Sequence, residues 1–145
     1  MYEVLPMAIT ADVLIVVAPS DKPVIRLAST QPNKFLSKEV EIPADGELSI
    51  DASTGDWTNY FLSSFRGATD FLRKGNATGQ FKSVGLDLLI DGSVPSGGGL
   101  SSSAAMVCAS VLATLKANGE EAINKKQVTE LAITAERGVG VNTGG

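Results

Sequence analysis

One stretch of this sequence constrains the fold more than any other: three consecutive glycines, Gly97–Gly99, are followed closely by three consecutive serines, Ser101–Ser103. Residues 84–90 before it are mostly apolar and predict a strand, and residues 101–116 show helical periodicity. Glycine backbone can approach a ligand closely and adopt positive φ. The first N–H groups of a helix lack internal partners and attract anions. The run Pro95–Ala105 therefore predicts a glycine-rich loop that holds phosphate groups.

The serines of this loop add a second kind of ligand. Their hydroxyls can bind phosphate oxygens or a metal ion, and we expect them also to cap the following helix. Other glycine-rich motifs do not match. A Walker loop requires a lysine, a dinucleotide fingerprint requires a third glycine where Ser102 stands, and a nucleophile elbow requires a glycine where Ser103 stands. A flexible linker remains as the alternative, but an apolar strand and an amphipathic helix adjoin the loop directly.

The absence of histidine excludes several chemistries from this chain. It rules out a Ser-His-Asp triad, a Cys-His pair and every histidine-based metal site within the sequence. Cys108 is the only cysteine, so no internal disulfide can form. Because Cys108 falls on the apolar side of the predicted helix, we interpret it as a small buried hydrophobe rather than a nucleophile.

Elsewhere the pattern predicts a mixed α+β domain. Strands are expected at 24–28 and 39–42, with one or two more between Val4 and Ala18. A helix is expected from near Trp57, with Asp56 as its N-cap and Gly75-Asn76 as its end. Its apolar stripe consists of Phe61, Phe65, Ala68 and Leu72. A last helix is expected from 126 to 137, with Val128, Leu131, Ala132 and Ala135 facing inward.

Charge and hydropathy limit the partners. The formal net charge is −4, with no basic cluster, which argues against nucleic acid as a partner. The longest apolar runs, such as Val13–Ala18, are too short to span a bilayer, so no membrane partner is expected. The first residues lack the pattern of a signal peptide. We therefore expect a cytoplasmic protein.

Four stretches, in order, resemble the GHMP kinases, a family of small-molecule kinases. The glycine-rich loop matches the family pattern Pro-x-Gly-x-Gly-Leu-(Gly/Ser)-Ser-Ser-Ala, and its three serines look like the galactokinase branch. Val4–Ile9 resembles the segment after that branch's Gly-Glu-His-x-Asp-Tyr signature. Asp56–Phe61 resembles its Trp-x-Asn-Tyr helix start. Residues 135–145 resemble the stretch leading into Gly-Met-Asp-Gln, and their Gly-Val-Asn is most similar to fungal members.

The resemblance implies a fold and a set of roles. The fold is the N-terminal domain of the GHMP kinases (ribosomal protein S5 domain 2-like), a mixed sheet with packed helices. Trp57 would lie at the adenine pocket, although a core position is nearly as plausible for a helix-start tryptophan. Gly144 would contact the sugar through its backbone. ATP would be held by Trp57, Pro95, Gly97, Gly98, Gly99, Leu100, Ser101, Ser102, Ser103 and Ala104.

The same resemblance implies a Mg²⁺ ion held by Ser103 and Glu136. Spacing alone does not lead to this role for Glu136, because a glutamate near a helix end is most often an ordinary solvated residue. With the resemblance, the carboxylate of Glu136 becomes the expected second protein ligand beside the hydroxyl of Ser103.

The implied activity is transfer of the γ-phosphoryl group of ATP to the C1 hydroxyl of α-D-galactose. The general base of the family would follow Gly145, and most of the sugar-binding residues would precede Val4. We therefore expect residues 1–145 to be a partial ATP-binding domain, truncated at both ends and inactive alone. Two alternatives stay open: an N-acetylgalactosamine kinase, and a non-catalytic galactose and ATP sensor with a regulatory protein partner. The complete serine run before Ala104 favours the catalyst.

Overall fold

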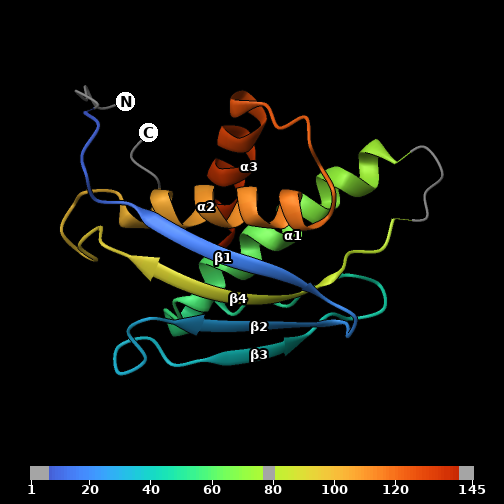
Figure 1. Cartoon of the computed structure of the whole chain (residues 1–145), viewed down its shortest axis with the longest axis horizontal. Helices are drawn as coiled ribbons and strands as arrows, with labels where there is room; N and C mark the ends of the chain where they lie inside the picture. The colour runs from blue at the N-terminus through green and yellow to red at the C-terminus, as the bar shows by residue number, and fades with distance from the viewer. Residues whose placement is uncertain (1–6, 77–80, 141–145) are drawn as a thin grey trace.

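The computed structural model describes residues 7–76 and 81–140 of the chain, and shows a four-stranded sheet with three α-helices (Figure 1). The sheet order is β1-β4-β2-β3. Strand β4 is antiparallel to β1 and parallel to β2, and β2 is antiparallel to β3. The elements are β1 (Val13–Ser20), β2 (Val24–Ser29), β3 (Lys38–Glu41), a short 3-10 helix (Ala52–Thr54), α1 (Thr58–Gly75), β4 (Gly85–Gly92), α2 (Ser102–Ala117) and α3 (Lys125–Gly138).

One face of the sheet is apolar and covered, and the other is open. Along β4, Leu86, Leu88 and Ile90 are buried whereas Leu89 between them is exposed. This alternation follows from the two-residue period of a strand. Helices α1 and α2 contribute side chains to the covered face, and α3 packs against both of them (Figure 1).

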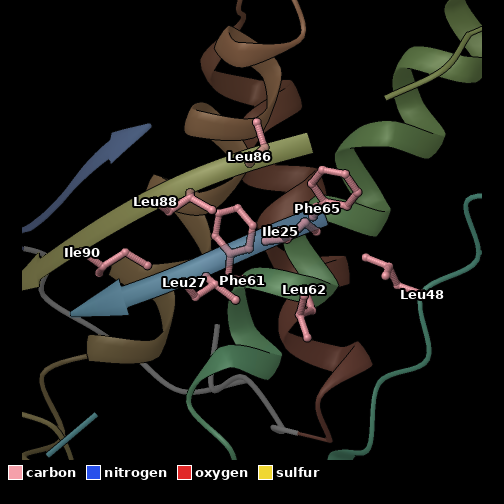
Figure 2. Packing of buried hydrophobic residues seen from close by; sticks show 9 residues of the cluster. All are labelled: Ile25, Leu27, Leu48, Phe61, Leu62, Phe65, Leu86, Leu88 and Ile90. Atoms are coloured by element: carbon pink, nitrogen blue, oxygen red, sulfur yellow. The ribbon is translucent and has the colours of Figure 1, made fainter. Parts of the chain in front are cut away.

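The main core joins α1 to the two central strands (Figure 2). Phe61 and Phe65 lie one helical turn apart on α1, with ring centroids 6.4 Å apart, and both are almost fully buried. They pack with Ile25 and Leu27 of β2 and with the buried residues of β4. Burial of each such side chain contributes about 1.5–3 kcal/mol to stability. This packing holds α1 against the centre of the sheet.

The parallel pairing of β2 with β4 positions the two segments that follow these strands. Ser29 pairs with Ile90 at the ends of the two strands, and the backbone N–H of Thr30 donates to the carbonyl of Ile90 at 3.0 Å. The segment after β2 and the glycine-rich loop after β4 therefore leave the sheet side by side. On the other side of β4, the N–H of Ser93 donates to the carbonyl of Asp12 at 3.0 Å.

Most of the predicted elements are confirmed, and one strand begins later than expected. The strands expected at 24–28, 39–42 and 84–90 correspond to β2, β3 and β4, and the three helices correspond to α1, α2 and α3. Between Val4 and Ala18, residues 7–12 form no strand, and β1 begins at Val13. Pairing explains this boundary, because Val13 faces Gly92, the last residue of β4. Residues 4–6 lie outside the described residues.

Asp56 caps the start of α1 as expected, although Trp57 directly precedes Thr58; the backbone of Trp57 is already helical and its side chain makes no capping hydrogen bond. The carboxylate of Asp56 accepts hydrogen bonds from the backbone N–H and hydroxyl of Thr58, at 2.9 and 2.8 Å, and forms an ion pair with Lys38 at 2.5 Å. Burial disfavours the ionised carboxylate, but the hydrogen bonds from Lys38 and Thr58 outweigh it and lower the pKa of Asp56. The contact with Lys38 also ties α1 to β3.

Replacing Asp56 with alanine should destabilise the chain by about 1–2 kcal/mol at neutral pH, because the cap and the ion pair are both lost. The pKa of Asp56 is lower in the folded chain than in the unfolded one, so its contribution is complete above the unfolded-state pKa and disappears as the pH falls through the folded-state pKa. The difference between wild type and Asp56→Ala in urea unfolding should shrink below pH 3.8. Asp21→Asn, an exposed change, is the control; a pH-independent difference would contradict this role.

Candidate functional site

A cavity of about 300 Å³ lies at the C-terminal ends of β2 and β4, beside the start of α2. Its walls come from four places: the strand ends, the segment after β2, the start of α1, and the glycine-rich loop with the first turns of α2. The lining residues are Val13, Ser29, Gln31, Lys34, Phe35, Gly55, Trp57, Tyr60, Ile90, Gly92, Val94, Ser96, Gly97, Ser102, Ser103 and Met106.

The glycine-rich loop has the backbone geometry that its sequence predicts. Gly97 and Gly99 have φ values of 75° and 69°, a region that glycine adopts without steric cost. Ser101 follows with φ 58°, and it is the one non-glycine residue with positive φ among residues 7–76 and 81–140. A residue with a Cβ atom loses about 1–2 kcal/mol in this conformation. Strain of this kind is typical of functional loops.

The expected capping of α2 by the serines is wrong. Ser101 occupies the N-cap position, but its side chain makes no capping hydrogen bond. A capping residue normally has extended backbone, which lets its side chain reach the N–H groups two and three residues ahead, and the left-handed conformation of Ser101 prevents this. The first turn of α2 therefore presents N–H groups without a side-chain partner at the edge of the cavity, where they are available to an anion.

The cavity brings together four of the residues predicted for the site: Trp57, Gly97, Ser102 and Ser103. The remaining predicted residues of the loop and helix start lie next to these in the chain but do not line the cavity. They are Pro95, Gly98, Gly99, Leu100, Ser101 and Ala104. Gly144 lies outside the described residues.

Trp57 serves both the core and the cavity. It is half-buried, packs against the main core, and also lines the cavity. Its indole N–H donates to the carbonyl of Leu36 at 3.1 Å, and the Phe35 ring meets it edge to face at 5.7 Å between centroids. The two interpretations of Trp57 from the sequence are therefore compatible.

Sequence reasoning missed several lining residues. Tyr60 could have been found, because it lies three residues after Trp57 and so on the same face of α1. Gln31, Lys34 and Phe35 carry no comparable signal. They reach the cavity because β2 pairs with β4, a contact between segments about 60 residues apart in the chain.

Glu136 is a buried residue rather than the solvated glutamate that spacing alone favours, and it does not line the cavity. Its side chain is on the inner side of α3, and the residue is only 6% exposed. The carboxylate forms no hydrogen bond or ion pair with any of the described residues. The neighbouring Ala135 packs with Val107 of α2, and this packing brings Glu136 close to Cys108. No described side-chain oxygen is both buried and without a hydrogen-bond partner, so the unpartnered Glu136 carboxylate keeps some contact with solvent.

The pKa of the Cys108 thiol responds to the charge of this carboxylate. Burial raises the pKa of the Cys108 thiol, and the negative charge of Glu136 raises it further. Cys108 is half-buried and packs against the small cluster of Val107, Ala132 and Ala135. Both observations agree with the interpretation of Cys108 as a structural residue.

A wider depression of about 610 Å³ over β2, β3 and β4 lacks the features of a site. Its main charged groups satisfy one another: Arg26 donates to Glu39 and to Asp87, both at 2.8 Å. No helix start or glycine-rich segment borders it. Within residues 7–76 and 81–140, no helix has the length and apolar character needed to cross a membrane.

Comparison with known proteins agrees with this geometry. The family model for the GHMP kinases N terminal domain matches residues 59–145, which include α1, β4, the glycine-rich loop, α2 and α3. The chain therefore belongs to the GHMP kinase family.

Two galactokinase sequences and two solved structures are similar to this chain. The galactokinases of Candida albicans and Saccharomyces cerevisiae are 42% and 40% identical to this chain over 99% of its length. The chain spans only 28% of each of these proteins. A crystal structure of Lactococcus lactis galactokinase complexed with galactose matches 94% of the chain and 32% of that protein, with a TM-score of 0.68 and 25% identity. Methanococcus jannaschii mevalonate kinase, with the same TM-score at 18% identity, matches 86% of this chain and 36% of that protein and shares the fold.

The proximity of Glu136 to Cys108 has a measurable consequence. Glu136→Gln removes a negative charge, so it should lower the pKa of the Cys108 thiol and shift the pH profile of its alkylation by iodoacetamide to lower pH. Glu130→Gln, an exposed change on the same helix, should leave the profile where it is. Identical profiles for Glu136→Gln and the wild type would show that the carboxylate does not face Cys108.

Proposed function

We propose that this chain supplies the nucleotide-binding part of a galactokinase, which transfers the γ-phosphoryl group of ATP to the C1 hydroxyl of α-D-galactose. One observation carries the proposal: the strained glycine-rich loop and the uncapped start of α2 border the same cavity as Trp57. About 40% identity to galactokinases over nearly the whole chain supports the choice of reaction.

ATP would bind with its phosphates on the loop and its adenine beside Trp57. The N–H groups of the first turn of α2 would hold the phosphates, with added hydrogen bonds from Ser102 and Ser103. The aromatic rings of Trp57 and Phe35 and the side chain of Tyr60 offer the apolar surface that a purine base requires. Phosphoryl transfer depends mainly on such positioning and on neutralisation of charge.

A Mg²⁺ ion shared with the phosphates would, in this proposal, take Ser103 and Glu136 as its protein ligands. Ser103 offers a hydroxyl at the cavity wall; Glu136 does not line the cavity, and its carboxylate forms no hydrogen bond or ion pair with the described residues. Hard oxygen ligands of this kind suit Mg²⁺, which usually takes only one or two ligands from the protein and keeps phosphate and water for the rest. When bound, the ion offsets the negative charge of the transferring group.

The remaining roles rest on the sequence resemblance. Gly144 would contact the sugar through its backbone. The general base that accepts or orients the hydroxyl proton of the sugar would come from outside residues 1–145, as would most of the sugar-binding groups. We place the reaction in the cytoplasm.

Ser103→Ala should weaken Mg²⁺ activation of the intact protein that carries this chain. Loss of one ligand should raise the Mg²⁺ concentration needed for half-maximal turnover, and lower kcat, by about 10- to 100-fold. The measurement is formation of galactose 1-phosphate from ATP and galactose across a Mg²⁺ titration.

Ser110→Ala is the matched control for this titration. Ser110 lies on the same helix but does not line the cavity, and its hydroxyl donates to the carbonyl of Met106 at 2.7 Å. Its loss removes a hydrogen bond within α2 and should leave the dependence on Mg²⁺ as it is in the wild type. An unchanged titration for Ser103→Ala would contradict the role of Ser103.

The alternatives give different outcomes in the same assay. A sugar panel that includes N-acetylgalactosamine would reveal a preference for that sugar. A sensor would bind galactose and ATP without forming product, and would need a protein partner for its effect. Turnover with galactose as the preferred sugar is the result that the proposed function predicts.

A further inference from the structure

The glycine-rich loop contains no lysine, but the cavity does. We propose that Lys34 binds the phosphate groups of the nucleotide and supplies by tertiary contact the cation that a Walker loop carries in its own sequence. The inference rests on the proposed function in one respect, namely that the ligand of this cavity is ATP.

Lys34 is joined directly to the glycine-rich loop. Its Nζ atom donates a hydrogen bond to the hydroxyl of Ser96 at 3.0 Å, although the two residues are 62 positions apart. Ser96 immediately precedes Gly97, and both line the cavity with Lys34. The ammonium group also lies 5.0 Å from the centre of the Phe35 ring, at a distance typical of a cation–π contact.

The backbone around Lys34 is held in place by the end of the sheet. The N–H groups of Lys34 and Phe35 both donate to the carbonyl of Gln31 at 3.0 Å, which forms a tight turn. The side-chain amide of Gln31 donates to the carbonyl of Gly92, the last residue of β4, at 3.4 Å. The turn that carries Lys34 is therefore attached to the strand that leads into the loop, which keeps the lysine close to the loop before a ligand arrives.

The charge of Lys34 is uncompensated within the described part of the chain. Other cations of the neighbouring strands are paired: Lys38 with Asp56, and Arg26 with Glu39 and Asp87. Lys34 forms no ion pair with residues 7–76 or 81–140, and it is the one charged side chain among the lining residues. A cation without a counter-ion, in the same cavity as the positive end of a helix dipole, favours an anionic ligand.

The chemistry of the ammonium group fits a phosphate. It carries three donors, of which one bonds Ser96, so two remain for phosphate oxygens. Charge-assisted hydrogen bonds of this kind are stronger than neutral ones. Lys34 should therefore contribute to binding in proportion to the negative charge of the nucleotide, and contribute nothing to binding of the nucleoside.

The test is calorimetric titration of the 145-residue chain with ATP, ADP and adenosine, for the wild type and three variants. Lys34→Gln removes the charge, and Lys34→Arg keeps it. Lys22→Gln removes another exposed charge, near the opposite end of β2. We expect Lys34→Gln to weaken ATP binding by about tenfold or more and adenosine binding by less than about twofold. Lys34→Arg should retain most of the affinity, and Lys22→Gln should match the wild type.

The outcomes separate this inference from the proposed function. If wild type and Lys34→Gln bind ATP equally, or if adenosine loses as much affinity as ATP, the role of Lys34 is wrong and the nucleotide site stands. If the folded wild-type chain binds no ATP, the nucleotide site and Lys34 are both rejected. A second measurement needs no variant: the affinity of the wild type for ATP should fall with rising salt, and that for adenosine should not. Equal salt dependence for both ligands would also overturn the role of Lys34.

Discussion

The parallel pairing of β2 with β4 is the contact on which the rest of the structure depends. It brings the C-terminal ends of two strands together, and each end leads directly into a segment that borders the cavity. After β2 comes the turn with Gln31, Lys34 and Phe35, and after β4 comes the glycine-rich loop. Packing of α1 against these strands then places Trp57 and Tyr60 at a third wall of the cavity. A site built in this way requires β2 and β4 to be paired.

Different parts of the molecule provide stability and binding: the apolar face of the sheet stabilises the fold, and the glycine-rich loop forms part of the cavity. The apolar face of the sheet, with Phe61 and Phe65 at its centre, supplies the burial that stabilises the fold. The loop, by contrast, carries features that lower stability: positive φ at Ser101 and an uncapped helix start. Glu136 is a largely buried residue whose carboxylate has no partner among the described residues. Phosphate and a cation would satisfy these groups, which is why we interpret them as binding features.

The elements with a strong local signal could be predicted from the sequence. Strands β2, β3 and β4 and all three helices follow from periodicity, and the cap at Asp56 follows from its chemistry and place. The glycine-rich loop could be predicted for the same reason, since its positive φ values are a local property of glycine. The expected capping by the serines fails for a local reason, the left-handed backbone of Ser101. The other features that sequence reasoning missed depend on tertiary contacts. The start of β1 is set by pairing, the burial of Glu136 by packing of α3, and the presence of Lys34 at the cavity by the sheet order.

The central claim is that one nucleotide occupies the cavity between the loop and the turn after β2. Amide hydrogen exchange of the chain, with and without saturating ATP, tests this claim most directly. ATP should slow exchange in two separate segments, 96–104 and 31–36, and leave the outer edge of the sheet at β3 unchanged. Slowed exchange confined to one segment, or centred on the depression over β2, β3 and β4, would contradict the account.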